Sequence, residues 1–448
     1  MPNYGGVVAD DRPPYVLLGA GNRADLYFTA ITGEYASTAR LVAICEPNRV
    51  RRDRYLARYA DRLPDAALPA AYDPDHLGDL LRDQNPGTVV VTSPDWTHAR
   101  WVTTALDAGW RVVCEKPLTI DVDGCRAIAE AAHRSPAELV VTFNYRYSPR
   151  NSALRQLLAA GAVGHVTSVV FEWLLDTGHG ADYFRRWHRE KRFSGGLLVH
   201  KASHHFDLVN WWLQDIPVEV VAHGTRRVYG PDGTASLVPG TFDLDLTSDT
   251  ELHELFGSAA TAEDGYVRNR GVTEPGVDIE DNLAAVVTYE RGPLLSYSLN
   301  AHAPWEGYRV AVNGTEGRLE LEVVERADVS AGPPVVDPSA RRDLASSRDP
   351  GDPARRPGTR LVLQRHWEPA REVPIQDDPS AHGGGDRLLV HDVFRGTAPD
   401  PLGRRAGLSD GLRSVLVGIA GNQSLASGVP VRIADLGVPG CAGRVPQL

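Results

Sequence analysis

Short apolar runs alternate with helix-length amphipathic stretches over the first third of the chain. Each run is too continuously apolar for a half-exposed strand and is typical of a strand buried on both faces. The runs lie at 15–19, 40–46, 88–93, 111–115 and 138–143, with helical stretches between them at 22–33, 49–59, 75–82, 96–108 and 121–133. Because strands that alternate with helices form parallel sheets, we predict an α/β domain over residues 1–150, with a doubly wound Rossmann sheet.

The pattern changes after about residue 150, where strands follow one another mostly without helices. These strands are expected at 165–175, 218–224, 283–290, 294–302, 308–314 and 318–324, with a long helix at 197–213, a second helix at 407–428 and a short edge strand after it. Such an order is typical of α+β domains. We therefore predict a second domain over residues 151–448, with an open, largely antiparallel sheet.

Three segments of the second domain carry no clear periodicity. Residues 229–280 are acidic and residues 328–359 are rich in proline, so both are expected to be surface excursions. Residues 176–193 mix aromatic and charged side chains and are expected to form a loop. None of the three predicts a core element.

Charge and cysteine usage narrow the possible partners and the compartment. The chain has 448 residues, with 47 basic and 58 acidic side chains and a net charge of −11. An acidic balance argues against nucleic acid or an anionic membrane as the main partner. No apolar run spans a membrane, the N-terminus lacks the pattern of a secretory signal, and the four cysteines form no C-x-x-C pair. These observations predict a cytoplasmic protein with reduced thiols.

A glycine-rich string follows the first strand and opens a helix. Gly19, Gly21 and Ala24 give the pattern G-x-G-x-x-A. The first glycine permits a tight turn, the second lets a pyrophosphate approach the backbone, and the small third residue allows close helix packing. The helix N-terminus then offers free N–H groups to phosphate. The string predicts dinucleotide binding.

The second strand ends at an acid that bears on the choice of dinucleotide. Glu46 lies 25 residues after Gly21, where a carboxylate binds ribose hydroxyls. Because a carboxylate repels a 2′-phosphate, we predict that NAD is preferred to NADP. Arg49, Arg51 and Arg52 follow closely, and they are alternative phosphate ligands.

Lysine is rare in this chain, because 44 of the 47 basic residues are arginine. A retained lysine indicates a site that needs a compact, titratable amine. Lys191 lies in a charged run and is expected to be solvated, whereas Lys116 follows the fifth strand in the string Glu-Lys-Pro. Ligands bind at the carboxyl ends of parallel strands, so this amine is placed to hydrogen-bond a reacting oxygen. A surface ion pair is the alternative for Lys116.

Taken in order, these motifs resemble those of the Gfo/Idh/MocA oxidoreductases, the relatives of glucose–fructose oxidoreductase and inositol dehydrogenase. The matching strings are G-x-G-x-x-A, the acid Glu46, residues 93–98 (SPDWTH), 115–117 (EKP), 143–147 (FNYRY), 195–196 (GG), 281–282 (DN) and 314–317 (GTEG). The resemblance runs from Tyr15 to about Ile433, outside the two excursions. It implies NAD(P)-linked oxidation or reduction of a CH–OH group of a sugar or cyclitol, in a homodimer or homotetramer. It also implies a set of cofactor contacts: Gly19, Gly21, Asn22, Arg23, Ala24, Glu46, Ser93, Pro94, His98, Glu115, Lys116 and Asn144.

The resemblance assigns roles on the predicted helix 197–213. His204 matches the acid/base histidine of the family and Asp207 its closing carboxylate, whereas His200 stands where an aspartate is usual. With 3.6 residues per turn, positions 200, 204 and 207 share one helix face. Lys116 and His204 are therefore the predicted catalytic residues. The predicted substrate-binding residues are Tyr145, Arg146, Asp182, Arg186, Trp187, His188, His200 and Lys201. Those at 182–188 are included because a mixture of aromatic and charged side chains suits a sugar, and a solvated basic loop is the alternative there.

Several alternatives fit the same residues. His200 and His204 are spaced as half of a zinc site, with His179, Asp182 or His188 as a third ligand, although we expect no metal. The same residues also suit an NAD-recycling glycosidase or lyase that acts through a transient keto-sugar, or an NAD-binding sensor without turnover. The glycine-rich turn at 382–386 either brings His382 to the site or caps the following helix through Asp386.

Overall fold

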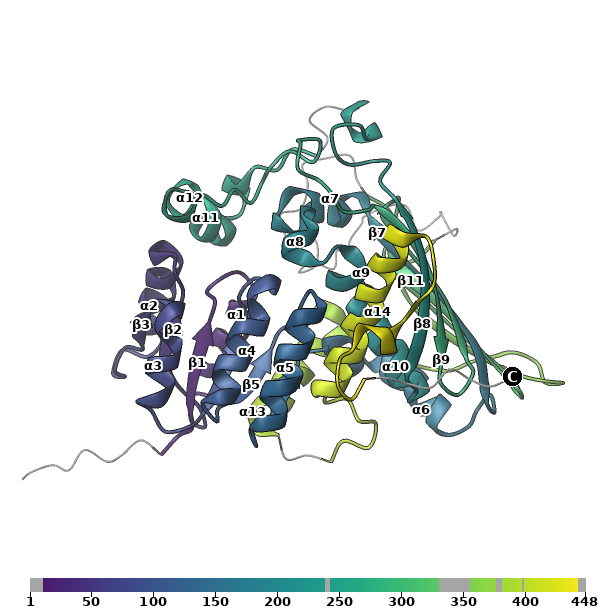
Figure 1. Ribbon diagram of the computed structural model, residues 1–448, viewed down its shortest axis with the longest axis horizontal. Coiled ribbons are helices and arrows are strands. Elements are labelled where there is room, and N and C mark those ends of the chain that lie inside the picture. Colours follow the sequence, from purple (N-terminus) through teal and green to yellow (C-terminus); the bar gives the residue numbers. More distant parts are fainter. Residues whose placement is uncertain (1–10, 238–241, 330–354, 376–380, 397–398, 442–448) are drawn as a thin grey trace, which may run out of the picture.

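The computed structural model describes residues 11–237, 242–329, 355–375, 381–396 and 399–441. Its N-terminal sheet is parallel, with the strand order β3–β2–β1–β4–β5–β6 (Figure 1). The strands are β1 (Pro14–Leu18), β2 (Arg40–Cys45), β3 (Ala70–Tyr72), β4 (Thr88–Val91), β5 (Arg111–Cys114) and β6 (Leu139–Val141). This is the order of dinucleotide-binding doubly wound sheets, in which ligands bind where the order reverses, between β1 and β4.

Helices cover both faces of this sheet, as predicted. They are α1 (Ala24–Thr32), α2 (Arg49–Arg62), α3 (Leu77–Arg82), α4 (His98–Asp107) and α5 (Val122–Arg134). Val16 and Leu18 of β1 pack with α3, α4 and α5, while Tyr15 and Leu17 pack with α1 and α2 on the opposite face. A helix from far along the chain, α13 (Gly385–Arg395), completes that second face.

The second sheet has the order β14–β13–β12–β11–β7–β10–β9–β8–β15. Among the described strands, β7 and β10 form its one parallel pair, and every other pair is antiparallel. The largely antiparallel second sheet is thus confirmed. Its strands are β7 (Val166–Asp176), β8 (Pro217–Thr225), β9 (Asn282–Tyr289), β10 (Leu294–Ala303), β11 (Glu306–Gly314), β12 (Gly317–Arg326), β13 (Gly358–Arg365), β14 (Arg371–Glu372) and β15 (Val431–Arg432).

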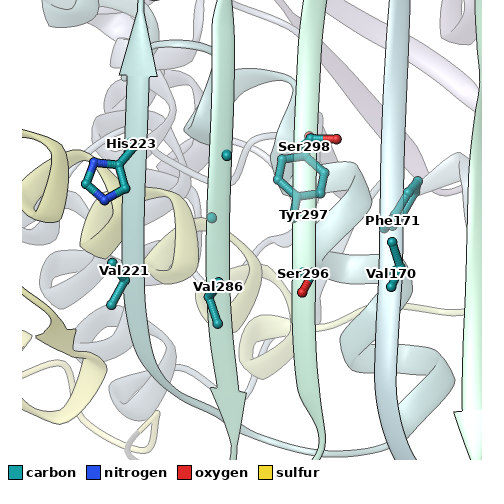
Figure 2. A pocket seen from close by; sticks show the side chains of 10 residues that line it. Val170, Phe171, Val221, His223, Val286, Ser296, Tyr297 and Ser298 are labelled. Carbon is teal, nitrogen blue, oxygen red and sulfur yellow. The ribbon is translucent and has the colours of Figure 1, made fainter.

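One face of the second sheet is covered and the other is open. Helix α14 (Leu408–Ser427) packs on β8, and α6 (Pro149–Ala159) lies beside the same helical layer (Figure 1). On the other face Val170, Ser296, Val286 and Val221 form a row across β7, β10, β9 and β8 (Figure 2). Val170 is 47% exposed and Val286 is 46% exposed. The row lines a shallow apolar depression.

The helix predicted at 197–213 is interrupted. It consists of α9 (Leu197–His200) and α10 (Ala202–Leu213), separated by Lys201, whose φ of −90° departs from the usual helical value. The break separates His200 from the helix that carries His204. The shared helix face predicted for these two histidines is therefore not a feature of one continuous helix.

Two segments predicted to lack regular structure contain helices. Residues 176–193 hold α7 (Thr177–Arg185), a 3₁₀ turn (Trp187–Arg189) and the start of α8 (Lys191–Ser194). The excursion at 229–280 contains α11 (Thr250–Phe256) and α12 (Ser258–Asp264), which pack against α2 and bury apolar residues there. Most of residues 328–359 lie outside the described chain. Within the described chain, no helix is both long and apolar enough to span a membrane.

Candidate active site

The loop between β1 and α1 has the geometry of a phosphate cradle. Gly19 has a φ of +92°, and a Cβ there would lie 2.6 Å from the backbone nitrogen of Ser93, so only glycine fits this turn. A Cβ at Gly21 would meet no atom within 4 Å. The space in front of this second glycine is therefore open to a ligand, and the residues present fit a dinucleotide pyrophosphate.

Glu46 lies at the end of β2, beside this loop. One carboxylate oxygen accepts the N–H of Ala20 at 2.8 Å, and the other accepts the N–H of Asn48 at 3.0 Å. These bonds hold a buried carboxylate next to the loop and leave lone pairs for further donors. The arrangement fits a ribose that offers its hydroxyls to Glu46.

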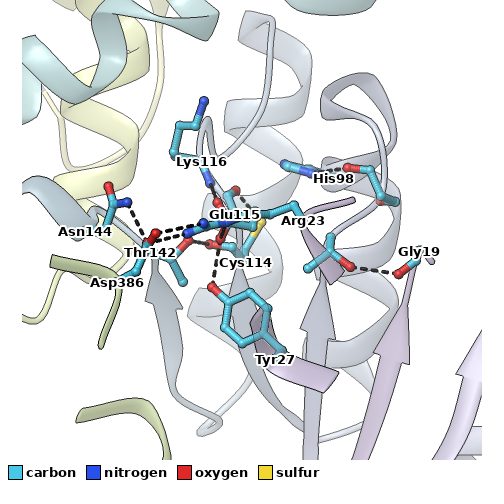
Figure 3. A network of polar contacts seen from close by, with 12 residues as sticks. Gly19, Arg23, Tyr27, His98, Cys114, Glu115, Lys116, Thr142, Asn144 and Asp386 are labelled. Atoms are coloured by element: carbon cyan, nitrogen blue, oxygen red, sulfur yellow. Dashed lines mark hydrogen bonds and ion pairs between the residues drawn. The ribbon is translucent and has the colours of Figure 1, made fainter. Parts of the chain in front are cut away.

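A partly buried ionic network lies beside the loop (Figure 3). Arg23 donates to Glu115 at 2.7 Å and to Asp386 at 2.9 Å, and Asn144 donates to the same oxygen of Asp386 at 2.8 Å. Asp386 was not among the predicted site residues. Of the two roles considered for the turn at 382–386, helix capping by Asp386 is not observed, because Gly384 is the N-cap of α13. The other role concerned His382, whose side chain lies outside the described residues. The glycine-rich turn thus brings a carboxylate to the network.

His98 connects the turns that follow β4 and β5. Its two ring nitrogens lie 2.8 Å from the carbonyl oxygens of Ser93 and Pro117. The ring is 1% exposed, so it is in place to hold the two turns together. His98 therefore links Pro117, the residue after Lys116, to the turn that follows β4.

Lys116, His200 and Asp95 form a chain of hydrogen bonds. The distance from Lys116 Nζ to His200 Nε2 is 3.4 Å, and that from His200 Nδ1 to Asp95 Oδ2 is 2.5 Å. An ammonium group only donates, so Nε2 accepts from Lys116 and Nδ1–H donates to the carboxylate. Burial and the neighbouring Lys116 lower the pKa of His200 well below its usual value, which keeps the ring neutral in this role.

Aromatic rings from the 177–189 segment surround His200. The ring centroids of His188, Tyr183 and Trp187 lie 4.2, 5.6 and 6.0 Å from that of His200.

Burial also lowers the pKa of Lys116. With this lowered pKa, the amine of Lys116 gives up a proton more readily than a fully exposed lysine does.

His204 lies in a second cluster, centred on Tyr145. Its ring stacks on Tyr145 with centroids 4.4 Å apart, and Lys201 donates to the Tyr145 hydroxyl at 3.3 Å. The amine of Lys201 also lies 4.8 Å from the ring centroid of Trp173. Burial lowers the pKa of Lys201 to about 8. Two of the three lysines, the half-buried Lys116 and the buried Lys201, thus lie in the candidate site.

Arg146 and Asp207 pair with each other. Arg146 donates from Nε and Nη2 to the two carboxylate oxygens of Asp207, at 2.8 and 2.5 Å, and also to Asp410 at 2.9 Å. Both partners are almost fully buried. Because Arg146 is engaged by Asp207 and Asp410, we propose that Arg146 and Asp207 have a structural role, and not the predicted substrate role of Arg146 or the role implied for Asp207 beside His204.

Asp182 and Arg186 are paired as well, and a third partner comes from the excursion. Arg186 donates to one oxygen of Asp182 at 2.9 Å, and Arg268 donates to the other at 3.1 Å. Lys191 forms an ion pair with Glu280 at 2.5 Å. The excursion therefore contacts the segment that surrounds His200.

The zinc site considered as an alternative is not assembled. Among the described residues, no group of three or more His, Cys, Asp or Glu side chains is placed to hold a metal ion. The two ring nitrogens of His200 face Lys116 and Asp95 instead. His200 and His204 thus do not belong to a common set of metal ligands, although their spacing in the sequence suits one.

Comparison with known families matches almost the whole chain. Residues 14–143 match the family model described as "Oxidoreductase family, NAD-binding Rossmann fold", and residues 155–433 match the "Oxidoreductase family, C-terminal alpha/beta domain". Both models carry the family name GFO_IDH_MocA. The two sheets described above fall within the two matches.

Individual relatives agree with the family match. A Bacillus subtilis (strain 168) protein whose name describes it as an oxidoreductase, YteT, is 33% identical over 84% of this chain and 88% of its own length. An inositol 2-dehydrogenase of Rhizobium meliloti is 29% identical over 46% of this chain and 56% of its own. The structure of a levoglucosan dehydrogenase in complex with NADH and levoglucosan has the same fold, with a TM-score of 0.62 and 17% identity over 94% of this chain and 99% of its own.

Proposed function

The chain belongs to the Gfo/Idh/MocA oxidoreductase family, and on this premise we propose that it is an NAD-dependent dehydrogenase or reductase of a sugar-like secondary alcohol. The observation that carries the proposal is the half-buried Lys116, which follows β5 and hydrogen-bonds to His200, itself paired with Asp95. It lies at the carboxyl edge of the parallel sheet, where this fold binds dinucleotides. Relatives named as inositol and levoglucosan dehydrogenases support a cyclitol or sugar substrate.

The residues of this chain supply the proton chemistry of such a reaction. When bound, the nicotinamide accepts or returns a hydride. Lys116 hydrogen-bonds the reacting oxygen and stabilises its developing negative charge. His204, at the position of the family's acid/base residue, takes the hydroxyl proton in oxidation and returns it in reduction. His200, paired with Asp95, holds the amine of Lys116 in place.

NAD should bind more tightly than NADP. The carboxylate of Glu46 accepts ribose hydroxyls and repels a 2′-phosphate, and its 6% exposure limits screening of that repulsion by water. Calorimetric titration of the chain with each nucleotide measures both affinities. Equal or tighter binding of NADP contradicts this preference and indicates Arg49 or Arg51 as a phosphate ligand.

A substrate panel tests the reaction itself. Sugars, cyclitols and glycosides are incubated with the enzyme and NAD, while NADH absorbance and the products are both followed. The proposal expects NADH to accumulate with at least one cyclic polyol. Products without lasting NADH contradict it in favour of redox-recycling glycoside cleavage, and nucleotide binding without any turnover favours a sensor.

The open face of the second sheet is the proposed contact between copies of the chain. An exposed, largely apolar patch is typical of a protein–protein interface, and the row of Val170, Ser296, Val286 and Val221, three valines and a serine, meets this description. The assembly is therefore expected to be a homodimer or homotetramer. Sedimentation equilibrium tests it, and a monomer at micromolar concentration contradicts it.

A further inference from the structure

The excursion (residues 229–280) reaches from the second sheet to the nucleotide-binding sheet. Its helices α11 and α12 lie beside α2, the helix that begins just after Glu46 (Figure 1). Asn48 is the N-cap of α2 and donates to the carbonyl oxygen of Ala260 in α12 at 2.8 Å. The excursion is thus fixed two residues away from the carboxylate proposed to bind ribose.

The excursion also occupies arginines that are alternative ligands of a 2′-phosphate. Arg51 donates to Asp264 at 2.6 Å, and its Nε donates to the carbonyl oxygen of Leu255 at 3.0 Å. Arg49 pairs with Glu263 at 3.1 Å. Carboxylates of α12 therefore face the first turn of α2, where a 2′-phosphate would need cations.

Arg51 is the cation that contacts Glu46 directly, with Nη1 at 3.4 Å from Oε1. Its side chain is only 9% exposed. Within the described chain its other terminal nitrogen, Nη2, is buried without a hydrogen-bond partner. Arg51 therefore keeps unused donor capacity beside the ribose carboxylate, while Asp264 balances its charge.

We propose that Asp264 is a cofactor-selectivity residue, which favours NAD by holding Arg51 in an ion pair and by placing a second carboxylate near Glu46. This inference rests on the proposed function, namely that the chain binds NAD at the β1–α1 loop. A 2′-phosphate would have to compete with Asp264 for Arg51 and would be repelled by two carboxylates. Selectivity would then depend on the excursion as well as on the end of β2.

Replacing Asp264 with asparagine should raise the affinity for NADP. Asparagine keeps the size of the side chain but removes its charge, so Arg51 becomes available to phosphate. A charge-assisted hydrogen bond from Arg51 to the 2′-phosphate should lower the Kd of NADP about tenfold. The Kd of NAD, which lacks this phosphate, should change by less than about threefold. Calorimetric titration of the full chain measures both constants, and the thermal unfolding midpoint with and without NADP gives a second readout.

Glu254→Gln is the matched control. Glu254 of α11 pairs with Arg54 of α2 at 2.8 Å. This variant therefore removes one charge from the contact between the excursion and α2 without affecting Arg51. In the Asp264→Asn background, Arg51→Gln should abolish the gain in NADP affinity. Circular dichroism checks that each variant folds, and Asp264→Ser replaces the asparagine variant if that one does not.

The possible results separate this inference from the proposed function. A gain in NADP affinity that is specific to Asp264 and depends on Arg51 supports the inference. Unchanged NADP affinity in a variant that still binds NAD overturns it and leaves the proposed function standing. An equal gain in Glu254→Gln also overturns it, because the effect would then be one of general charge. If the unmodified chain binds neither nucleotide, the proposed function fails and the inference fails with it.

Discussion

Replacing Lys116 with arginine should lower kcat by about 10²- to 10³-fold, the usual effect of removing one donor to a developing oxyanion. Arginine keeps the positive charge but is bulkier and does not release its proton near neutral pH. The amine of Lys116 is half-buried and hydrogen-bonded to His200, so the larger guanidinium does not fit its space. Initial rates with the best substrate of the panel measure the loss.

The affinity for NAD should stay within a few-fold in this variant, because Lys116 is proposed to contact the reacting oxygen of the substrate. Lys191→Arg provides the matched control. Its amine pairs with Glu280 and is partly exposed, so the same chemical change there should leave kcat unaltered. If Lys116→Arg retains activity within a few-fold of the original chain, Lys116 belongs to a structural ion network and the proposed mechanism fails.

The parallel sheet could be predicted because its pattern is local. In β1, Val16 and Leu18 enter one core while Tyr15 and Leu17 enter the other, which explains why the run is apolar throughout. By contrast, the strand β3 (Ala70–Tyr72) was not predicted, because it lies at the edge of the sheet, is largely exposed and therefore carries no apolar run. The division of the chain at about residue 150 remains a proposal, supported by family matches that end at residue 143 and resume at residue 155.

The candidate site was predicted only in part, because its decisive contacts join distant parts of the chain. Asp386 meets Arg23 across 363 positions, and Asp95 meets His200 across 105. No local pattern encodes such pairs. The break at Lys201 was missed for a related reason, since the apolar period continues through it while the buried amine turns toward Tyr145.

Replacing His204 with alanine should lower kcat by about 10²- to 10⁴-fold, the usual span for loss of a general base. The ring of His204 stacks on Tyr145, and alanine at this position leaves no group to accept the hydroxyl proton. His165→Ala changes an exposed histidine of the second domain and should leave kcat unchanged. A loss of less than about fivefold in His204→Ala would assign proton transfer to another group, with the neutral His200 beside Lys116 as the first alternative.

Changing His200 to aspartate distinguishes these roles further. His200 Nδ1 lies 2.5 Å from Asp95, so a carboxylate at position 200 would face a second carboxylate. Two carboxylates this close cannot both ionise freely, and one pKa rises. We therefore expect His200→Asp alone to lower kcat, although it introduces the residue usual in the family.

The double variant Asp95→Asn, His200→Asp leaves one carboxylate beside Lys116. Its kcat should be at least about tenfold higher than that of His200→Asp alone, because the negative charge that holds the amine has only moved from position 95 to position 200. If the double variant is no more active than His200→Asp, Asp95 and His200 do not act together in positioning Lys116.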